Sequence, residues 1–204
     1  METLTAPPPA KGRPREFCVD EALTAALRVF WQHGYEGASL AELTAAMGIT
    51  KPSLYAAFGN KESLFCKALD LYEREKLAYV GEALKAPTSR GVAEHLLRGS
   101  LAMTTSTCDP KGCLGVISTV ACTGENASIK EHVAARRTSS HVALVARFDR
   151  AREEGDLPAT IAPEALASYL TAIMQGMAVQ AGAGASVGDL ERLIETSLAV
   201  WPGR

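Results

Sequence analysis

Aromatic side chains are scarce in this 204-residue sequence, and it has neither a long hydrophobic run nor a strong net charge. Phe, Trp and Tyr make up 6% of the residues while 47% are hydrophobic, so alanine and leucine must supply most of the core. Such side chains favour helices, which argues against an all-β fold. The formal charge of −2 gives no bulk attraction to nucleic acid. A DNA-binding role therefore has to depend on where the charges lie.

Signals for export and for a disulfide framework are also missing. No run of about 18 apolar residues occurs, and Pro7, Pro8 and Pro9 stand where a signal peptide needs an apolar core. We therefore expect a cytoplasmic protein that has no membrane partner. The five cysteines are an odd number without an export signal, so we expect free thiols at Cys18, Cys66, Cys108, Cys113 and Cys122.

The sequence contains no pattern typical of a metal site or of nucleophilic catalysis. His95, His132, His141 and the cysteines match no recognised ligand spacing, so we expect no metal. No G-x-S-x-G motif occurs, and the charged runs at 147–150 and 152–154 are typical of solvated helix faces. We expect neither enzymatic activity nor a cofactor.

Residues 1–15 are predicted to form a disordered basic arm. Lys11, Arg13 and Arg15 are opposed there only by Glu2. Such an arm is either a solubilising tail or a DNA-groove contact, and the sequence leaves both interpretations open.

Three short helices are predicted after the arm. The first begins at Asp20 and closes at His33 and Gly34. Ser39 and Glu42 form an S-x-x-E capping box that begins the second helix, which Gly48 ends.

The third helix has its own start signals and a core pair. Thr50 is suited to cap it, and Pro52 is tolerated in its first turn because the N–H groups there lack partners within the helix. Leu54 and Phe58 supply an i, i+4 pair for the core.

The remainder of the chain is predicted to be helical as well. A long helix from Lys61 towards Leu84 is stopped by Pro87, and about five further helices follow. The run from Gly112 to Val120 is interpreted as a helix, since a lone strand would leave its backbone groups unpaired. The breaks lie at Pro87, Asp109–Pro110, near Gly124, at 155–163 and at 182–188.

The two helices between Ser39 and Phe58 have a helix-turn-helix arrangement, in which the second helix enters the major groove. Residues 11–62 contain six basic and six acidic residues, yet no acid occurs between Thr50 and Lys61. A solvated helical hairpin is the alternative interpretation. Cations and hydroxyls that suit phosphate oxygens are offered by Thr50, Lys51, Ser53, Tyr55, Asn60 and Lys61.

The same segment carries a family resemblance. GYEGASLAEL at 34–43 and GITKPSLYAAFGNKESL at 48–64 resemble the signature of TetR/AcrR-type transcriptional repressors. Thr44 and Pro52 are mild departures, since smaller residues are usual at those two positions. The resemblance implies an all-α homodimer with an N-terminal three-helix helix-turn-helix domain at 16–62. It also implies a larger C-terminal helical domain at 63–204 for ligand binding and dimerisation.

The resemblance also implies a function and its residues. We expect a ligand-responsive repressor that binds a palindromic operator in double-stranded DNA as a dimer and is released by a small-molecule inducer. Base reading would fall to residues 50–53 and Ala56, where apolar contact to thymine methyl groups is favoured. DNA contacts are expected from Ser39, Thr50, Lys51, Pro52, Ser53, Tyr55 and Lys61.

Two apolar stripes near the C-terminus predict a four-helix dimer interface. One runs from Leu166 to Met177, and the other from Leu190 to Trp201. The inducer pocket is expected to be mostly apolar. We expect it to draw on Met103, Cys113, Ile117, Tyr169 and Ile173.

Cys113 allows a second functional interpretation. The stretch KGCL at 111–114 resembles a subgroup of the family that responds to electrophiles and small metabolites. A thiol beside Lys111 and near a helix N-terminus would be the more reactive one, giving a thiol-based electrophile or redox sensor. Packing as a small hydrophobic residue is the alternative for Cys113. A helical enzyme with a vestigial helix-turn-helix and a DNA-binding scaffold without an inducer also stay open.

Overall fold

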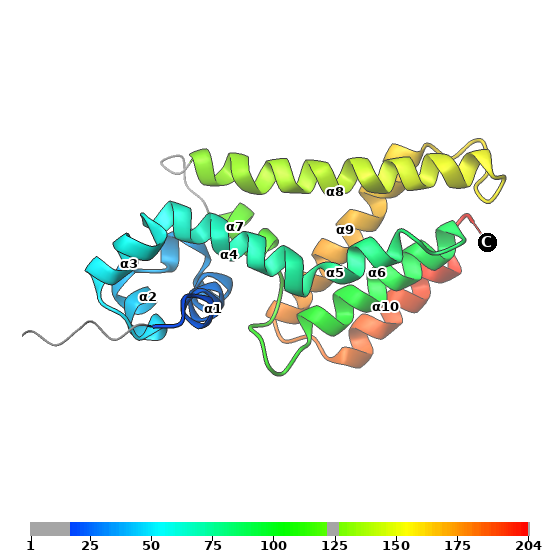
Figure 1. The fold of residues 1–204 in the computed structure, drawn as a ribbon. Helices are drawn as coiled ribbons and strands as arrows, with labels where there is room; N and C mark the ends of the chain where they lie inside the picture. The colour runs from blue at the N-terminus through cyan, green and yellow to red at the C-terminus, as the bar shows by residue number, and fades with distance from the viewer. Residues whose placement is uncertain (1–16, 122–126, 204) are drawn as a thin grey trace, which may run out of the picture.

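The computed structural model describes residues 17–121 and 127–203, and every regular element in those ranges is an α-helix. The all-α prediction is therefore confirmed, whereas the expected basic arm and the break near Gly124 lie outside the described residues. No helix in the described ranges is long and apolar enough to cross a membrane. In chain order (Figure 1) the helices are α1 (Val19–Gly37), α2 (Leu40–Met47), α3 (Lys51–Phe58), α4 (Lys61–Lys76), α5 (Ala78–Ala83), α6 (Ser89–Thr104), α7 (Leu114–Ala121), α8 (Ala127–Glu153), α9 (Pro163–Gly182) and α10 (Val187–Ala199).

The predicted caps of α2 and α3 are present. Ser39 Oγ accepts from the Glu42 N–H at 3.1 Å, and Glu42 Oε2 accepts from the Ser39 N–H at 2.9 Å. Thr50 Oγ1 accepts from the Ser53 N–H at 3.3 Å. Gly48 joins the two helices at φ 66°, a left-handed conformation that glycine adopts without a Cβ penalty. These local bonds set the angle between α2 and α3.

The first core lies inside α1–α4 and also reaches α7 and α8. Trp31 and Tyr72 meet edge to face with ring centroids 4.8 Å apart, and Phe30 meets Phe65 in the same way at 5.0 Å. Leu114 of α7 packs in this cluster, as do Ile129 and Val133 of α8. The N-terminal helices therefore share a continuous core with the rest of the chain, and no open linker separates them.

Two expected helix boundaries differ from the structure. The first helix breaks at Gly34 (φ 69°, ψ −179°), as predicted, but a further short helical piece then runs to Gly37. The prediction of a single helix from Lys61 to Leu84 is wrong, because the chain breaks at Leu77 into two helices, α4 and α5. After the break, the ring of Tyr79 occupies the space that a Cβ at Gly99 would need. The close contact of α5 with α6 decides this break, and no glycine or proline marks it in the sequence.

The second core is formed by α6, α8, α9 and α10, and it corrects the interpretation of the two apolar stripes. Leu170 and Met177 of α9 are fully buried within the single chain, as is Leu190 of α10, and Trp201 is 7% exposed. The stripes therefore pack against α6 and α8 of the same chain. Amphipathic spacing predicted the apolar face correctly but not its partner.

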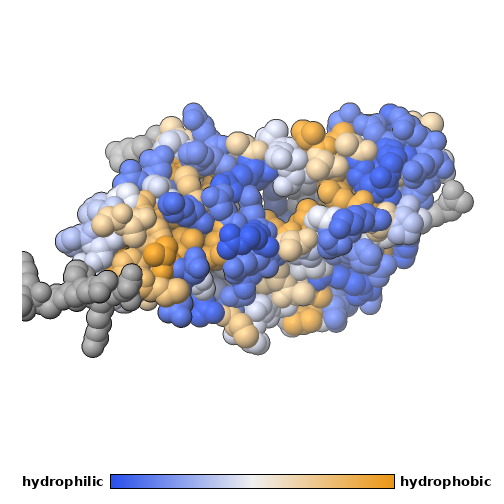
Figure 2. Space-filling view, viewed as in Figure 1, coloured by the Kyte–Doolittle hydropathy of each residue, from blue (hydrophilic) through white to orange (hydrophobic). Residues whose placement is uncertain are grey.

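Helix α8 stands apart from the body along much of its length (Figure 1). No side chain between Ala134 and Ala143 is buried, although both ends of the helix are anchored. Towards the N-terminal end, Ile129 and Val133 are buried in the first core, and Arg136 then pairs with Asp70 and Glu73 of α4, each at 2.6 Å. At the other, the buried Arg147 donates to the Ala86 carbonyl at 2.7 Å. The middle of α8 spans a hollow, which Figure 2 shows beneath it.

Candidate functional site

The exposed face of α3 carries most of the predicted DNA contacts. Leu54 and Phe58 are buried against the first core, which turns Lys51, Pro52 and Tyr55 outward, and 48% of Tyr55 is exposed. Ser39 and Thr50 are also exposed, at the N-caps of α2 and α3. The helices that carry these residues, α2 and α3, lie at one end of the molecule (Figure 1).

Lys61 lies beside this face, at the first residue of α4. Its Nζ sits 4.5 Å from the centre of the Tyr35 ring, a cation–π contact that fixes the side chain. Burial lowers the pKa of Lys61, while the nearby Glu36 and Glu42 act in the opposite direction. Lys61 thus joins the start of α4 to both α1 and α2.

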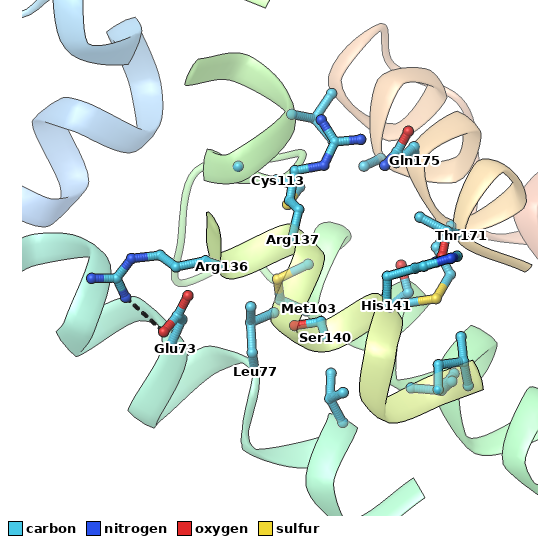
Figure 3. A pocket seen from close by; sticks show the side chains of 18 of the residues that line it. Glu73, Leu77, Met103, Cys113, Arg136, Arg137, Ser140, His141, Thr171 and Gln175 are labelled. Carbon is cyan, nitrogen blue, oxygen red and sulfur yellow. Dashed lines mark hydrogen bonds and ion pairs between the residues drawn. The ribbon is translucent and has the colours of Figure 1, made fainter. Parts of the chain in front are cut away.

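A cavity of about 420 Å³ lies under α8, in the size range of small-molecule sites. Its walls come from α4 to α9 and from residues between them (Figure 3). The apolar part includes Leu69, Tyr72, Leu77, Tyr79, Val80, Leu84, Leu96, Met103, Val133, Leu144 and Met174. The polar part includes Glu73, Ser100, Arg136, Arg137, Thr138, Ser140, His141, Thr171 and Gln175.

The structure brings together some of the five predicted pocket residues. Met103 and Cys113 line the cavity, whereas Ile117, Tyr169 and Ile173 are not part of its lining. Ile117 packs against the first core and Ile173 against the second, and Tyr169 is 40% exposed on α9. Helical spacing placed these residues on α7 and α9 but did not show which face meets the cavity.

Cys113 and Met103 share a hydrogen-bond donor inside the cavity. Tyr72 Oη lies 3.0 Å from Met103 Sδ and 3.4 Å from Cys113 Sγ. Burial is the main cause that raises the pKa of Tyr72 well above its ordinary value, and the neighbouring Cys113 raises it further. The phenol therefore stays protonated and donates towards the two sulfur atoms.

The polar lining supplied by α8 and α9 was not predicted from the sequence. Arg137 and His141 of α8 extend towards Gln175 and Thr171 of α9 (Figure 3). A signal exists in the sequence, because the stretch AARRTSSH at 134–141 holds no large apolar residue to pack against a core. Such a stretch in a long helix indicates a segment that lines solvent or a cavity.

A buried hydrogen bond links the cavity wall to α1. The indole Nε1 of Trp31 donates to the carbonyl of Gly112 at 3.2 Å, directly before Cys113 in the chain. Trp31 also packs edge to face on Tyr72. The same indole thus touches α4 and the segment that carries Cys113.

No group of three or more metal-ligating side chains is found among the residues that the structure describes. Of the cysteines in that part, Cys18 and Cys108 are exposed, Cys66 and Cys113 are half-buried, and all four are free thiols. Burial raises the pKa of the Cys66 thiol.

Known proteins match both parts of the chain. Residues 22–67 match the family described as bacterial regulatory proteins, tetR family, and residues 94–196 match the tetracyclin repressor-like C-terminal domain. The chain is 34% identical to the HTH-type transcriptional repressor ComR of Escherichia coli (strain K12), over 95% of this chain and 93% of that protein. It is 28% identical to the HTH-type transcriptional repressor AcnR of Corynebacterium efficiens, over 97% of this chain and 98% of that protein.

A solved structure agrees with these relatives. A cysteine mutant of the TetR family transcriptional regulator CifR, complexed with 26-base-pair double-strand operator DNA, matches with a TM-score of 0.87 and 41% identity. The match covers 93% of this chain and 100% of that one. The fold and the exposed third helix define a helix-turn-helix DNA-binding protein. The chain belongs to the TetR family of transcriptional regulators.

Proposed function

We propose that this protein is a ligand-responsive transcriptional repressor, which binds a palindromic operator as a homodimer and is released by a small-molecule inducer. The observation that carries the proposal is that α4 belongs to both sites. It begins at Lys61 beside the exposed face of α3, and its later turns supply Leu69, Tyr72 and Glu73 to the cavity wall. A ligand that moves α4 would therefore move the surface that meets DNA.

The division of labour that we propose assigns operator reading to residues 16–62 and ligand binding and dimerisation to residues 63–204. Lys51, Pro52 and Tyr55 would face the major groove, with Ser39, Thr50, Ser53 and Lys61 on phosphates. CifR, bound to its operator in the solved structure, supports this orientation by the similarity of its fold.

Transmission from the cavity to the DNA surface has a second route besides α4. The segment holding Gly112 and Cys113 is bound to Trp31 of α1 through the indole hydrogen bond. A ligand that binds best when the two helix-turn-helix domains of the dimer are further apart would lower operator affinity, because it stabilises that form. In the dimer these two domains would occupy successive major grooves, about 34 to 36 Å apart.

The exposed face of α9 is the surface that we propose for dimerisation. Glu164 is the only charged residue in α9, and the rest of the helix is made of apolar, small and uncharged polar residues. Tyr169 and Val179 are exposed on this helix, and 57% of Val179 is accessible to solvent. An exposed helix face with a single charge over this length is typical of a self-complementary interface.

The dimer is tested by sedimentation at micromolar concentration. Val179→Glu places a charge on the proposed interface without touching either core, so we expect it to yield monomers. Val19→Glu, at an exposed position in the first turn of α1, is the matched control and should remain dimeric. A wild-type monomer at that concentration would contradict the homodimer.

The central claim is tested by selecting binding sites from random double-stranded DNA. We expect an enriched sequence with two-fold symmetry and a steep salt dependence, since each neutralised phosphate adds about 0.9 to the log–log slope. If no sequence is enriched over the starting pool, the repressor function is wrong.

A second candidate function is covalent sensing at Cys113. The Tyr72 hydroxyl donates towards the Cys113 sulfur inside the cavity. Burial raises the pKa of the Cys66 thiol, which lowers the reactivity of that thiol. We expect iodoacetamide to alkylate Cys113 faster than Cys66 and to release DNA. Cys113→Ser should abolish that release while Cys66→Ser keeps it. Equal labelling of both thiols would leave Cys113 as a packing residue.

A further inference from the structure

We propose that the inducer is an amphipathic carboxylate, with its charged group at the polar side formed by α8 and α9 and its hydrocarbon part along α4, α5 and α6. The proposal rests on the ligand-responsive function above and names the chemical class that the same cavity selects. It depends on three features of the lining: its charge, its hydrogen-bond donors and its apolar wall.

The charge of the lining disfavours a cationic ligand. Among the described residues that line the cavity, Glu73 is the one carboxylate, and Arg136 pairs with it at 2.6 Å. Arg137 adds a second guanidinium and His141 an imidazole, one turn further along α8. Arg136 also pairs with Asp70 at 2.6 Å, so both of these carboxylates of α4 already have a cationic partner. A cationic ligand would find no carboxylate without a partner among these residues, so the charge selects against amines.

The hydrogen-bond groups of the lining favour a ligand rich in acceptor oxygens. Arg137 carries a planar fork of N–H groups that matches a carboxylate in two places, and it lies near Gln175 (Figure 3). The Tyr72 hydroxyl donates towards the sulfurs of Met103 and Cys113, which are weak acceptors. The Tyr72 hydroxyl is thus directed at these sulfurs on the α4 side, and the donors for the head group are those of α8 and α9.

The apolar wall explains why the anion should carry a hydrocarbon part. Leu77, Val80 and Leu84 follow one another along α5 and its two caps. Leu96 of α6 and Leu144 of α8 also line the cavity. The break at Leu77 turns these side chains into the cavity instead of continuing a straight helix. Burial of apolar surface contributes about 25 cal/mol per Å², which a free inorganic anion lacks.

The test compares ligands that share one body and differ in their head group. Octanoate and 4-phenylbutyrate are the carboxylates, octanamide and 4-phenylbutyramide the neutral partners, and octylammonium the cation. Binding is measured by calorimetry, and release of the selected operator by fluorescence anisotropy, on the full chain. We expect both carboxylates to bind and to release DNA, with the amides at least about tenfold weaker, because a charge-assisted bond is lost.

Arg137→Gln should lower carboxylate affinity by about tenfold, because the charge-assisted hydrogen bond to the guanidinium is lost. The affinity for the amides should not change, since they carry no charge. Arg150→Gln is the matched control on the same helix, outside the cavity, and should bind carboxylates as the wild type does. Arg137→Lys should restore part of the affinity, since it keeps the charge but loses the fork.

The outcomes separate this proposal from the ligand-responsive function. If the amides or octylammonium release the operator as well as the carboxylates do, or if Arg137→Gln binds octanoate normally, the carboxylate class is wrong and the inducer function stands. If no probe of any charge binds or releases the operator, both are wrong. A protein that selects no operator at all would overturn the proposed function independently of the cavity.

Discussion

The DNA-facing surface takes its residues from one stretch, 39–61, while the cavity collects side chains from Leu69 to Ala178. The first surface is held by caps, a glycine turn and two core side chains within a few residues of each other. The second depends on α8 being anchored at Arg136 and Arg147 so that its middle spans a hollow. One site is therefore determined locally and the other by packing between distant helices.

If the two sites are separable in this way, substitutions on α3 should change DNA binding and leave ligand binding unchanged. Lys51→Ala/Tyr55→Ala removes an exposed cation and an exposed aromatic ring. We expect operator affinity to fall by about 100-fold, near 2.7 kcal/mol, with calorimetric binding of a cavity ligand unchanged. A loss of ligand binding in this variant would break the comparison, because it would show that α3 also shapes the cavity.

The junction between the sites is tested by Trp31→Phe, which keeps ring packing but removes the donor to the Gly112 carbonyl. We expect a loss of about 1 to 2 kcal/mol in the free energy of unfolding, because a buried acceptor is left unpaired. We also expect weaker coupling between ligand and operator.

Trp201→Phe is the matched control for the junction, since its indole donates to Ser89 Oγ at 3.2 Å within the second core. Denaturant unfolding should show a comparable loss, with coupling unchanged. Equal coupling in both variants would mean that α4 alone transmits the signal.

Lys61→Ala tests the point where α4 meets the DNA-facing surface. We expect about fivefold weaker binding to all DNA sequences, and a salt slope lower by about 0.9, since one phosphate contact is lost. Anisotropy titrations at several salt concentrations measure both. An unchanged slope would assign Lys61 to the Tyr35 contact alone.

The smallest effect is expected at the capping box of α2. Ser39→Ala should lower the free energy of unfolding by about 0.5 to 1 kcal/mol.

Hydrogen bonds from the Ser39 backbone and side chain lower the pKa of Glu42. The contribution of Glu42 to the free energy of unfolding is therefore present above the ordinary carboxyl pKa, and it is lost as the pH falls through the lowered pKa. Glu42→Gln should remove that part of the acid dependence in thermal unfolding. The same acid dependence in Glu42→Gln would contradict this role.

The apolar stripes of α9 and α10 show what spacing alone leaves open. Leu170, Met177 and Leu190 were correctly placed on buried faces, but they pack within the chain and not against a second copy. Periodicity reports which side of a helix avoids water, and any apolar neighbour satisfies it. The outer face of α9, where Glu164 is the one charged residue, is recognised only once the inner face is known, and it now carries the dimer proposal.

The sequence by itself determined the helical fold, the caps at Ser39 and Thr50, and the exposed face of α3, because these depend on residues within a turn or two of one another. Only the tertiary structure decided the break at Leu77, the burial of the C-terminal stripes, and the meeting of Arg137, Tyr72 and Gln175 around one cavity. These features arise from contacts between helices far apart in the chain. A single helix holds no information on which neighbour will pack against it, so they could not be predicted from local spacing.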